Sequence, residues 1–336
     1  MKWSVLDQSP AKQGEGEDAA IRESLALARR CDELGYHRYW VSEHHNTVAL
    51  AGTAPEILIS AIAATTRRIR VGSAGVMLPH YSALKVAEQF RVLEAIAPGR
   101  IDLGVGRAPG SDRQTGLALN PYSNAAEEFP RQVIELLAWL GSAPMPGDHP
   151  FRNVVAHPRS STSPELWILG SSDYGAQLAA HFGLPYAFAY FFTDGRGVEQ
   201  ALSLYRRLFQ PSPHLAAPQA TICVWALAAE STDEARRLAT SRELWRIGRD
   251  HGQRAALASP EAATVYEYTL EDRASVAAMR ERALVGSAAE VSGELLALSQ
   301  RLELEEVVIN TWTFDPAARV RSYELLAGEL GLRATP

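Results

Sequence analysis

The chain has little of what marks a secreted, membrane-bound or disulfide-stabilised protein. Only two cysteines, Cys31 and Cys223, occur among 336 residues. Each falls inside a helical or strand pattern, so we expect buried thiols in a reducing compartment rather than a disulfide. No apolar run approaches the length that spans a bilayer, and Met1-Lys2 leads into a strand-like run without a signal sequence. The sequence therefore predicts a cytoplasmic protein.

The chain also lacks an excess of positive charge. The formal net charge is −6 and no block of the chain is rich in Lys or Arg, which argues against nucleic acid as a partner. Hydrophobic residues make up 46% and charged residues 21% of the chain, the composition of an ordinary enzyme-sized protein. This length suits two average domains or one large α/β barrel. Because neither a repeat nor an interdomain linker is visible, we predict one domain over residues 1–336.

Short apolar, β-branched or aromatic runs indicate strands, and helical patterns separate most of them. The strand runs lie at 2–6, 38–43, 69–74, 101–106, 166–170, 186–191, 221–228 and 307–312. The helical patterns lie near 17–34, 53–65, 82–96, 126–140, 173–182, 196–209, 232–250, 288–301 and 316–330. Strands that alternate with helices form parallel sheets. Eight such units predict a (β/α)8 TIM barrel, and a doubly wound open sheet is the alternative.

The longest interval between strand runs lies between the seventh and the eighth. Its middle, roughly residues 251–286, is rich in alanine and weakly patterned. We predict an insertion here, which could act as a lid over the mouth of the barrel.

The most unusual stretch is Trp40-Val41-Ser42-Glu43-His44-His45-Asn46, a strand that ends in an acid, two imidazoles and an amide. Parallel α/β proteins hold their ligands at the carboxyl ends of the strands. We therefore predict that this segment lines the functional site, and a polar loop that merely caps the sheet is the alternative. A metal at Glu43-His44-His45 is disfavoured, because adjacent strand residues point to opposite faces and no further ligand spacing accompanies them.

An anion site is predicted where the fifth strand run meets the next helix. The segment Gly170-Ser171-Ser172-Asp173-Tyr174-Gly175 offers backbone N–H groups, two hydroxyls and a helix N-terminus, and a plain helix cap is the alternative. Arg107, at the end of the fourth strand run, can bind the same phosphate. Ala74 and Gly75 end the third run, where small residues let a planar ligand approach the backbone. Together these features indicate one planar, phosphate-bearing cofactor.

Two competing motifs are incomplete. Gly104-Val105-Gly106 begins like a dinucleotide fingerprint, but the third glycine is Gly110 and position 109 is proline. The segment that starts at Gly170 is similar to the nucleophile elbow of a hydrolase, but Tyr174 stands where that motif needs its second glycine. The sequence therefore disfavours both a nicotinamide-binding Rossmann domain and a serine hydrolase.

Three segments together resemble the bacterial luciferase-like flavin monooxygenases, with Gly170-Ser171-Ser172 in register. They are Tyr36-His37-Arg38-Tyr39-Trp40-Val41-Ser42-Glu43-His44-His45, Ile69-Arg70-Val71-Gly72-Ser73-Ala74-Gly75-Val76-Met77-Leu78-Pro79 and Pro98-Gly99-Arg100-Ile101-Asp102-Leu103-Gly104-Val105-Gly106-Arg107-Ala108-Pro109-Gly110. The resemblance implies a (β/α)8 barrel that binds FMN and uses the reduced flavin with O2. It also implies a homodimer formed through helices of the N-terminal half.

The resemblance further implies roles by position. His44 matches the active-site histidine of the family, Arg107 an arginine at the flavin phosphate, and residues 171–175 (Ser171, Ser172, Asp173, Tyr174 and Gly175) the phosphate loop. Ala74-Gly75 matches a bond that is often a non-proline cis peptide beneath the flavin ring. Gly106 stands where the luciferase α chain has a cysteine near the flavin, so light emission on a long-chain aldehyde is not implied.

We therefore expect an FMN-dependent monooxygenase that uses reduced flavin and O2 to oxidise a small organic substrate. Without a nicotinamide fingerprint, the chain would receive reduced FMN from a separate flavin reductase. The alternatives are a deazaflavin-dependent hydride-transfer enzyme and a non-catalytic flavin-binding protein. The cofactor would bring the oxygen chemistry, and His44, with an ordinary pKa near ~6.5, would exchange protons near neutrality.

Overall fold

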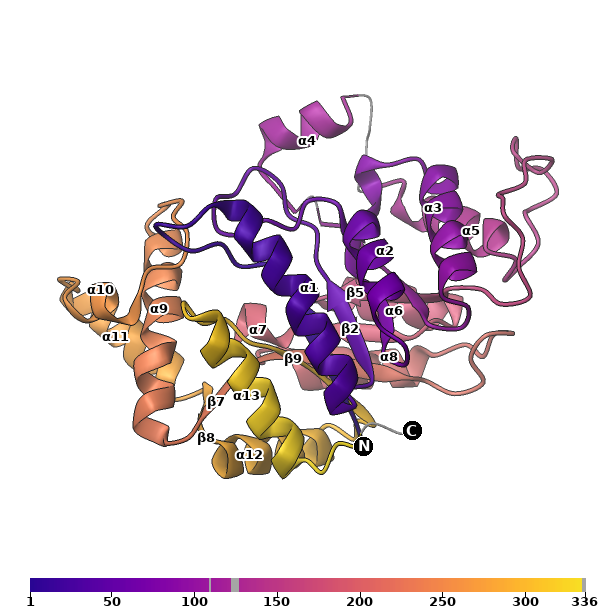
Figure 1. The fold of residues 1–336 in the computed structure, drawn as a ribbon. Coiled ribbons are helices and arrows are strands. Elements are labelled where there is room, and N and C mark those ends of the chain that lie inside the picture. The colour runs from indigo at the N-terminus through magenta and orange to yellow at the C-terminus, as the bar shows by residue number, and fades with distance from the viewer. Residues whose placement is uncertain (109, 122–126, 334–336) are drawn as a thin grey trace.

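Eight parallel strands close into a barrel, and helices surround it (Figure 1). The structure is a computed structural model that describes residues 1–108, 110–121 and 127–333. In ring order the strands are β1 (Lys2–Asp7), β2 (Arg38–Val41), β3 (Arg70–Met77), β4 (Ile101–Gly106), β5 (Glu165–Gly170), β6 (Tyr186–Phe188), β7 (Ala220–Ala229) and β9 (Glu306–Asn310). β9 pairs with β1, which completes the ring. The predicted (β/α)8 barrel is therefore confirmed, and the open sheet is excluded.

Helices follow the strands as the sequence pattern predicts, with short additions. They are α1 (Glu17–Leu34), α2 (Pro55–Thr65), η1 (Leu78–His80), α3 (Ala83–Ile96), α4 (Arg113–Leu119), α5 (Phe129–Trp139), α6 (Asp173–Phe182), α7 (Tyr190–Thr193), α8 (Val198–Leu208), α9 (Thr232–Asp250), α10 (Pro260–Thr264), α11 (Leu270–Arg280), α12 (Ala288–Arg301) and α13 (Pro316–Glu329). Residue 126, the predicted start of the helix observed as α5, lies outside the described residues. Within the described part of the chain, no helix is long and apolar enough to span a membrane.

The insertion predicted at 251–286 is present, and most of it lies beside the barrel. Its helices α10 and α11 pack against α9 (Figure 1). It ends in β8 (Leu284–Ser287), a ninth strand that the sequence pattern did not predict. β8 pairs with residues 226–229 of β7, beyond the part of β7 that pairs with β9. Residues 253–255 line a cavity at the mouth, and closure of the insertion as a lid stays a prediction.

Side chains alternate between the two faces of each strand. In β2, Tyr39 and Val41 join the large hydrophobic core between strands and helices, whereas Trp40 joins a smaller cluster inside the ring. Trp40 meets Trp167 of β5 there, with ring centroids 5.2 Å apart at 70°. Both thiols are free and buried, as predicted: Cys31 in the outer core and Cys223 inside the ring.

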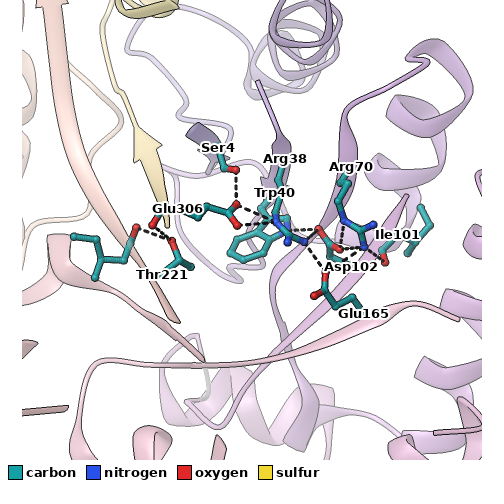
Figure 2. A network of polar contacts seen from close by, with 10 residues as sticks. Ser4, Arg38, Trp40, Arg70, Ile101, Asp102, Glu165, Thr221 and Glu306 are labelled. Carbon is teal, nitrogen blue, oxygen red and sulfur yellow. Dashed lines mark hydrogen bonds and ion pairs between the residues drawn. The ribbon is translucent and has the colours of Figure 1, made fainter. Parts of the chain in front are cut away.

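The amino-terminal end of the barrel holds a buried ionic cluster (Figure 2). Its centre is Arg38, whose guanidinium is 2.9 Å from Asp102, 2.8 Å from Glu165 and 2.9 Å from Glu306. Arg70 also pairs with Asp102. The side chain of Arg38 is 3% exposed and that of Asp102 is fully buried. These residues come from β2, β3, β4, β5 and β9, so the cluster joins more than half of the ring.

Burial and pairing oppose each other in this cluster. Burial by itself disfavours ionised Asp102, but the attraction of Arg38 and Arg70 outweighs it and lowers the pKa of that carboxyl. For Glu306 burial dominates over the attraction of Arg38, so its pKa is raised. The ionised carboxylate of Asp102 therefore balances the charges of Arg38 and Arg70.

Removing Asp102 should destabilise the fold strongly. An Asp102→Ala variant leaves the buried guanidinium of Arg38 and the partly exposed one of Arg70 short of a counter-ion. Breaking a buried pair in this way costs about 3–5 kcal/mol of unfolding free energy. The measurement is urea unfolding followed by circular dichroism. The control is Asp18→Ala, which breaks an exposed pair with Arg22 on α1 and should leave the midpoint unchanged. A similar shift in both variants would contradict the role of the cluster.

Candidate active site

The residues that the sequence singled out meet at the carboxyl ends of neighbouring strands. His44 follows β2, Ala74 and Gly75 lie in β3, Arg107 follows β4, and residues 171–175 follow β5. All of these positions except Asp173 line one cavity of about 260 Å³. Side chains from segments far apart in sequence therefore share one space, although the roles assigned to them stay predictions.

The floor of this cavity includes the backbone at Ala74 and Gly75. The Ala74–Gly75 peptide bond is cis, as the resemblance implied. A Cβ added to Gly75 would collide with the Leu169 side chain and lie 2.6 Å from the carbonyl oxygen of Gly104. Glycine is required at this position, because the backbone of β4 leaves no space for a side chain. Gly75 therefore adds no side chain to the floor, and a planar ring can approach the backbone closely.

One end of the cavity is formed by the amino terminus of α6. Ser172 is the N-cap residue, but its side chain accepts no capping hydrogen bond from the helix. The nearby carboxylate of Asp173 accepts a hydrogen bond from Gln200 at 2.5 Å, so it is held by a neighbour on α8. The backbone N–H groups of the first turn and the positive end of the helix dipole thus remain available to an anion.

Arg107 supplies a cation at the same end. Its guanidinium carbon lies 3.9 Å from the ring centroid of Tyr174, in the first turn of α6. Within residues 1–108, 110–121 and 127–333, no carboxylate forms an ion pair with Arg107. An uncapped helix start beside an unpaired guanidinium is the donor set that a phosphate requires, so these residues fit a phosphate-bearing cofactor.

His44 lies at the junction of this cavity with a second one. Its Nδ1 is 3.1 Å from the hydroxyl of Ser42, and its backbone N–H donates to the carbonyl of Gly52 at 2.9 Å. Burial lowers the pKa of His44 to about 4, against the weaker opposing effect of Glu43. The imidazole is therefore neutral near pH 7, in contrast to the expectation of a group that titrates there. A neutral ring can still accept or donate one hydrogen bond through Nε2.

Its polar neighbours in sequence serve to hold the loop. The Glu43 carboxylate accepts hydrogen bonds from Tyr81 at 2.5 Å and from the backbone N–H of Met77 at 2.9 Å, and lies 2.7 Å from Nε2 of His45. Asn46 donates to the carboxylate of Asp112 at 2.8 Å. Among the described residues, no group of three His, Cys, Asp or Glu side chains could hold a metal ion.

The second cavity, of about 480 Å³, is lined in part by residues that the sequence pattern did not single out. Asn310, at the end of β9, donates to Gln8, just after β1, at 2.5 Å, and both line this space with His44. Asn310 lies inside the last predicted strand run, 307–312, where a polar side chain after three apolar residues was the available signal. Further lining comes from α9 and from Trp312. The face of α9 that meets the barrel depends on tertiary packing, so no local pattern marks it.

Residues 1–304 match the family described as luciferase-like monooxygenase. This chain belongs to that family. A luciferase-like monooxygenase of Escherichia coli strain K12 is 40% identical over 324 residues, which are 96% of this chain and 95% of the relative. The N-acetyl-S-alkylcysteine monooxygenase of Bacillus subtilis is 35% identical over 329 residues, 97% of each chain. The resemblance found in the sequence is thus confirmed, and the chain is an enzyme of the monooxygenase class.

Solved structures agree with the barrel of this monooxygenase. The crystal structure of apo-MsnO8 superposes with a TM-score of 0.90 at 36% identity, covering 100% of this chain and 99% of that one. Two more distant structures share the fold. The oxygenating constituent of 3,6-diketocamphane monooxygenase from a Pseudomonas putida plasmid, in complex with FMN, has a TM-score of 0.73 at 19% identity and full coverage of both chains. An F420-dependent secondary alcohol dehydrogenase has a TM-score of 0.64 at 15% sequence identity, and the alignment covers 97% of each chain.

The lowered pKa of His44 should appear as a pH-dependent loss of stability. In the unfolded chain this histidine titrates near ~6.5, and in the folded monooxygenase near pH 4. Its neutral form therefore stabilises the fold above pH 6.5, and this contribution is lost as the pH falls towards 4. Between pH 7 and pH 5 the parent should lose about 1–2 kcal/mol more unfolding free energy than His44→Gln.

Urea unfolding of both proteins at the two pH values measures this difference. His37, whose pKa burial also lowers to about 4, is present in both proteins and cancels. An equal pH dependence in parent and variant would show that His44 titrates normally.

Proposed function

We propose that this chain is the oxygenase of a two-component, FMN-dependent system. It receives reduced FMN from a separate flavin reductase and uses O2 to oxidise a small organic substrate. The observation that carries this proposal is the single cavity in which a flat glycine floor, the neutral imidazole of His44 and the anion-binding end at Arg107 meet.

The residues of the cavity divide into a cofactor part and a reaction part. Arg107 and the first turn of α6 would hold the phosphate, and the floor at Ala74 and Gly75 would support the ring. Bound reduced FMN supplies the electrons that activate O2. His44, oriented by Ser42, stands where the two cavities join and can move a proton through Nε2. Phe191 lines both cavities and contributes apolar surface that keeps water away.

The related proteins support this assignment in part. One relative is named as a monooxygenase of N-acetyl-S-alkylcysteine, which supports oxidation of a small organic molecule. A distant structural neighbour holds FMN, whereas another acts with F420. Deazaflavin-dependent hydride transfer is therefore the second candidate. The homodimer stays a prediction; α2 and α3 carry Ile57, Val92 and Ile96, which are 69%, 48% and 47% exposed.

Arg107 should matter for the phosphate of FMN and not for the flavin ring. Replacing it by alanine removes a charge-assisted contact, so FMN affinity should fall by about 1–3 kcal/mol. Riboflavin has the same ring without the phosphate, and its affinity should change little. Quenching of flavin fluorescence measures both, with Arg113→Ala on the exposed helix α4 as the control. An equal effect on FMN and riboflavin would contradict the placement of the phosphate at Arg107.

The reaction with oxygen tests the proposed function itself. The protein is mixed anaerobically with reduced FMN and then with oxygenated buffer, and the return of oxidised-flavin absorbance and the yield of hydrogen peroxide are recorded. The cavity should slow reoxidation and delay peroxide release relative to free reduced FMN, because bound flavin is shielded from water. Reoxidation at the free rate, with tight binding of a deazaflavin, would favour hydride transfer instead.

A further inference from the structure

The second cavity at the barrel mouth has a surplus of cationic side chains. Four arginines line it: Arg242, Arg246 and Arg249 from α9, and Arg254 from the loop that follows. Three of them have acidic partners. Arg246 pairs with Asp194 at 2.8 Å, Arg249 with Asp250 at 2.7 Å, and Arg254 with Asp112 at 3.5 Å.

Arg242 is the exception. Within the described part of the chain it forms neither an ion pair nor a hydrogen bond. Its guanidinium carbon lies 4.2 Å from the ring centroid of Trp225, so an aromatic face orients the group without using its N–H donors. Burial, reinforced by the charge of Arg246, lowers the pKa of Arg242 to about 9, which leaves it charged at neutral pH. A partly buried cation without a counter-ion is costly unless a ligand supplies the negative charge.

The rest of the cavity wall suits an apolar body. Trp245 and Trp312 meet edge to face, with ring centroids 4.8 Å apart. Both line the space, as do Leu50 and Phe191. At about 480 Å³ the cavity has the size of a small-molecule site, where a few polar groups fix the orientation of a mostly apolar ligand.

The cavity also reaches the reaction part of the site. Gln8, His44, Phe191 and Phe192 line both this cavity and the cofactor cavity. A molecule whose charged end lies at Arg242 can therefore place its other end beside His44. Neither His44 nor Gln8 carries a charge at neutral pH, and the charges of Arg246, Arg249 and Arg254 are balanced by acidic partners. Among the described residues that line this cavity, Arg242 is therefore the arginine whose charge is left for a ligand.

We propose that the substrate is an amphipathic organic anion whose carboxylate or sulfonate group is held by Arg242 while its apolar body packs against Trp245 and Trp312. This inference rests on the proposed function, because it names the class of molecule that the monooxygenase oxidises. Arg242 is a substrate-binding residue, and its guanidinium gives the two parallel donors that a carboxylate or sulfonate accepts.

Binding of matched probes tests the proposal without turnover. Octanoate, octanesulfonate and the neutral isostere octanamide are titrated into the protein, with and without oxidised FMN, and calorimetry gives each affinity. Octanoate or octanesulfonate should bind about 10- to 100-fold more tightly than octanamide, the value of a hydrogen bond to a charged group. The stronger of the two anions identifies the oxyanion that the site prefers.

Three variants test whether the anionic group binds at Arg242. Arg242→Met keeps the apolar stem and should abolish the preference over octanamide, and Arg242→Lys should restore part of it. Arg237→Met removes the same charge on α9 outside the cavity, where Arg237 pairs with Glu234 and Glu261, and should keep the full preference. Equal binding of octanoate, octanesulfonate and octanamide to the parent protein would overturn the proposal, as would an unchanged preference in Arg242→Met.

FMN titration of the parent protein separates this inference from the function on which it rests. If FMN binds and the anions are not preferred, only the assignment of an anionic substrate fails. If FMN does not bind, the proposed function fails. A preference for anions that depends on Arg242 would then still show that this cavity binds organic anions.

Discussion

The guanidinium of Arg38 is the interaction on which the rest of this barrel depends. It reaches the carboxylates of Asp102, Glu165 and Glu306 and so joins β2 to β4, β5 and β9 across the inside of the ring (Figure 2). A charge in that position has left water, and only several well-placed partners can offset the loss of hydration. The cluster fills the amino-terminal end of the barrel with packed, paired groups. The two cavities of the candidate site lie at the opposite end.

Above that cluster the lumen becomes apolar and then opens. Trp40 and Trp167 meet inside the ring, and Gly104 stands level with Trp167 and Ala74 in the sheet register. Gly104 has no room for a Cβ because the backbone of Ser73 lies against it, and Gly75 has none because the carbonyl oxygen of Gly104 does. These glycines let β3 and β4 approach each other closely. Gly75 and Ala74 also line the cofactor cavity.

The two cavities at the mouth divide the chemistry between them. One offers backbone N–H groups and Arg107 to a phosphate, and the other offers Arg242 in an aromatic wall; neither arginine has an acidic partner among the described residues. His44 stands between them as a neutral imidazole, because burial lowers its pKa. Arg242 keeps its charge at neutral pH, because its lowered pKa of about 9 is still above 7.

The sequence by itself determined the kind of fold and the ends of the strands where the site lies. Period-two and helical patterns predicted all eight barrel strands, and Gly75, Arg107 and the 171–175 segment were visible as strand-end features. The strand β8 was missed because its two apolar residues are followed at once by Gly286 and by Ser287, the cap of the next helix, so no apolar run marks it. Only the tertiary structure decided which of two adjacent residues supports the fold and which lines the site. Glu43 turns to Tyr81 and Met77 while His44 enters the cavity. Arg38 pairs with Glu306, 268 residues further along the chain, and Arg242 has no acidic partner among the residues that the structure describes. Local patterns record the direction of a side chain from its own strand or helix, whereas charge pairing and burial depend on which distant segments the closed ring brings together.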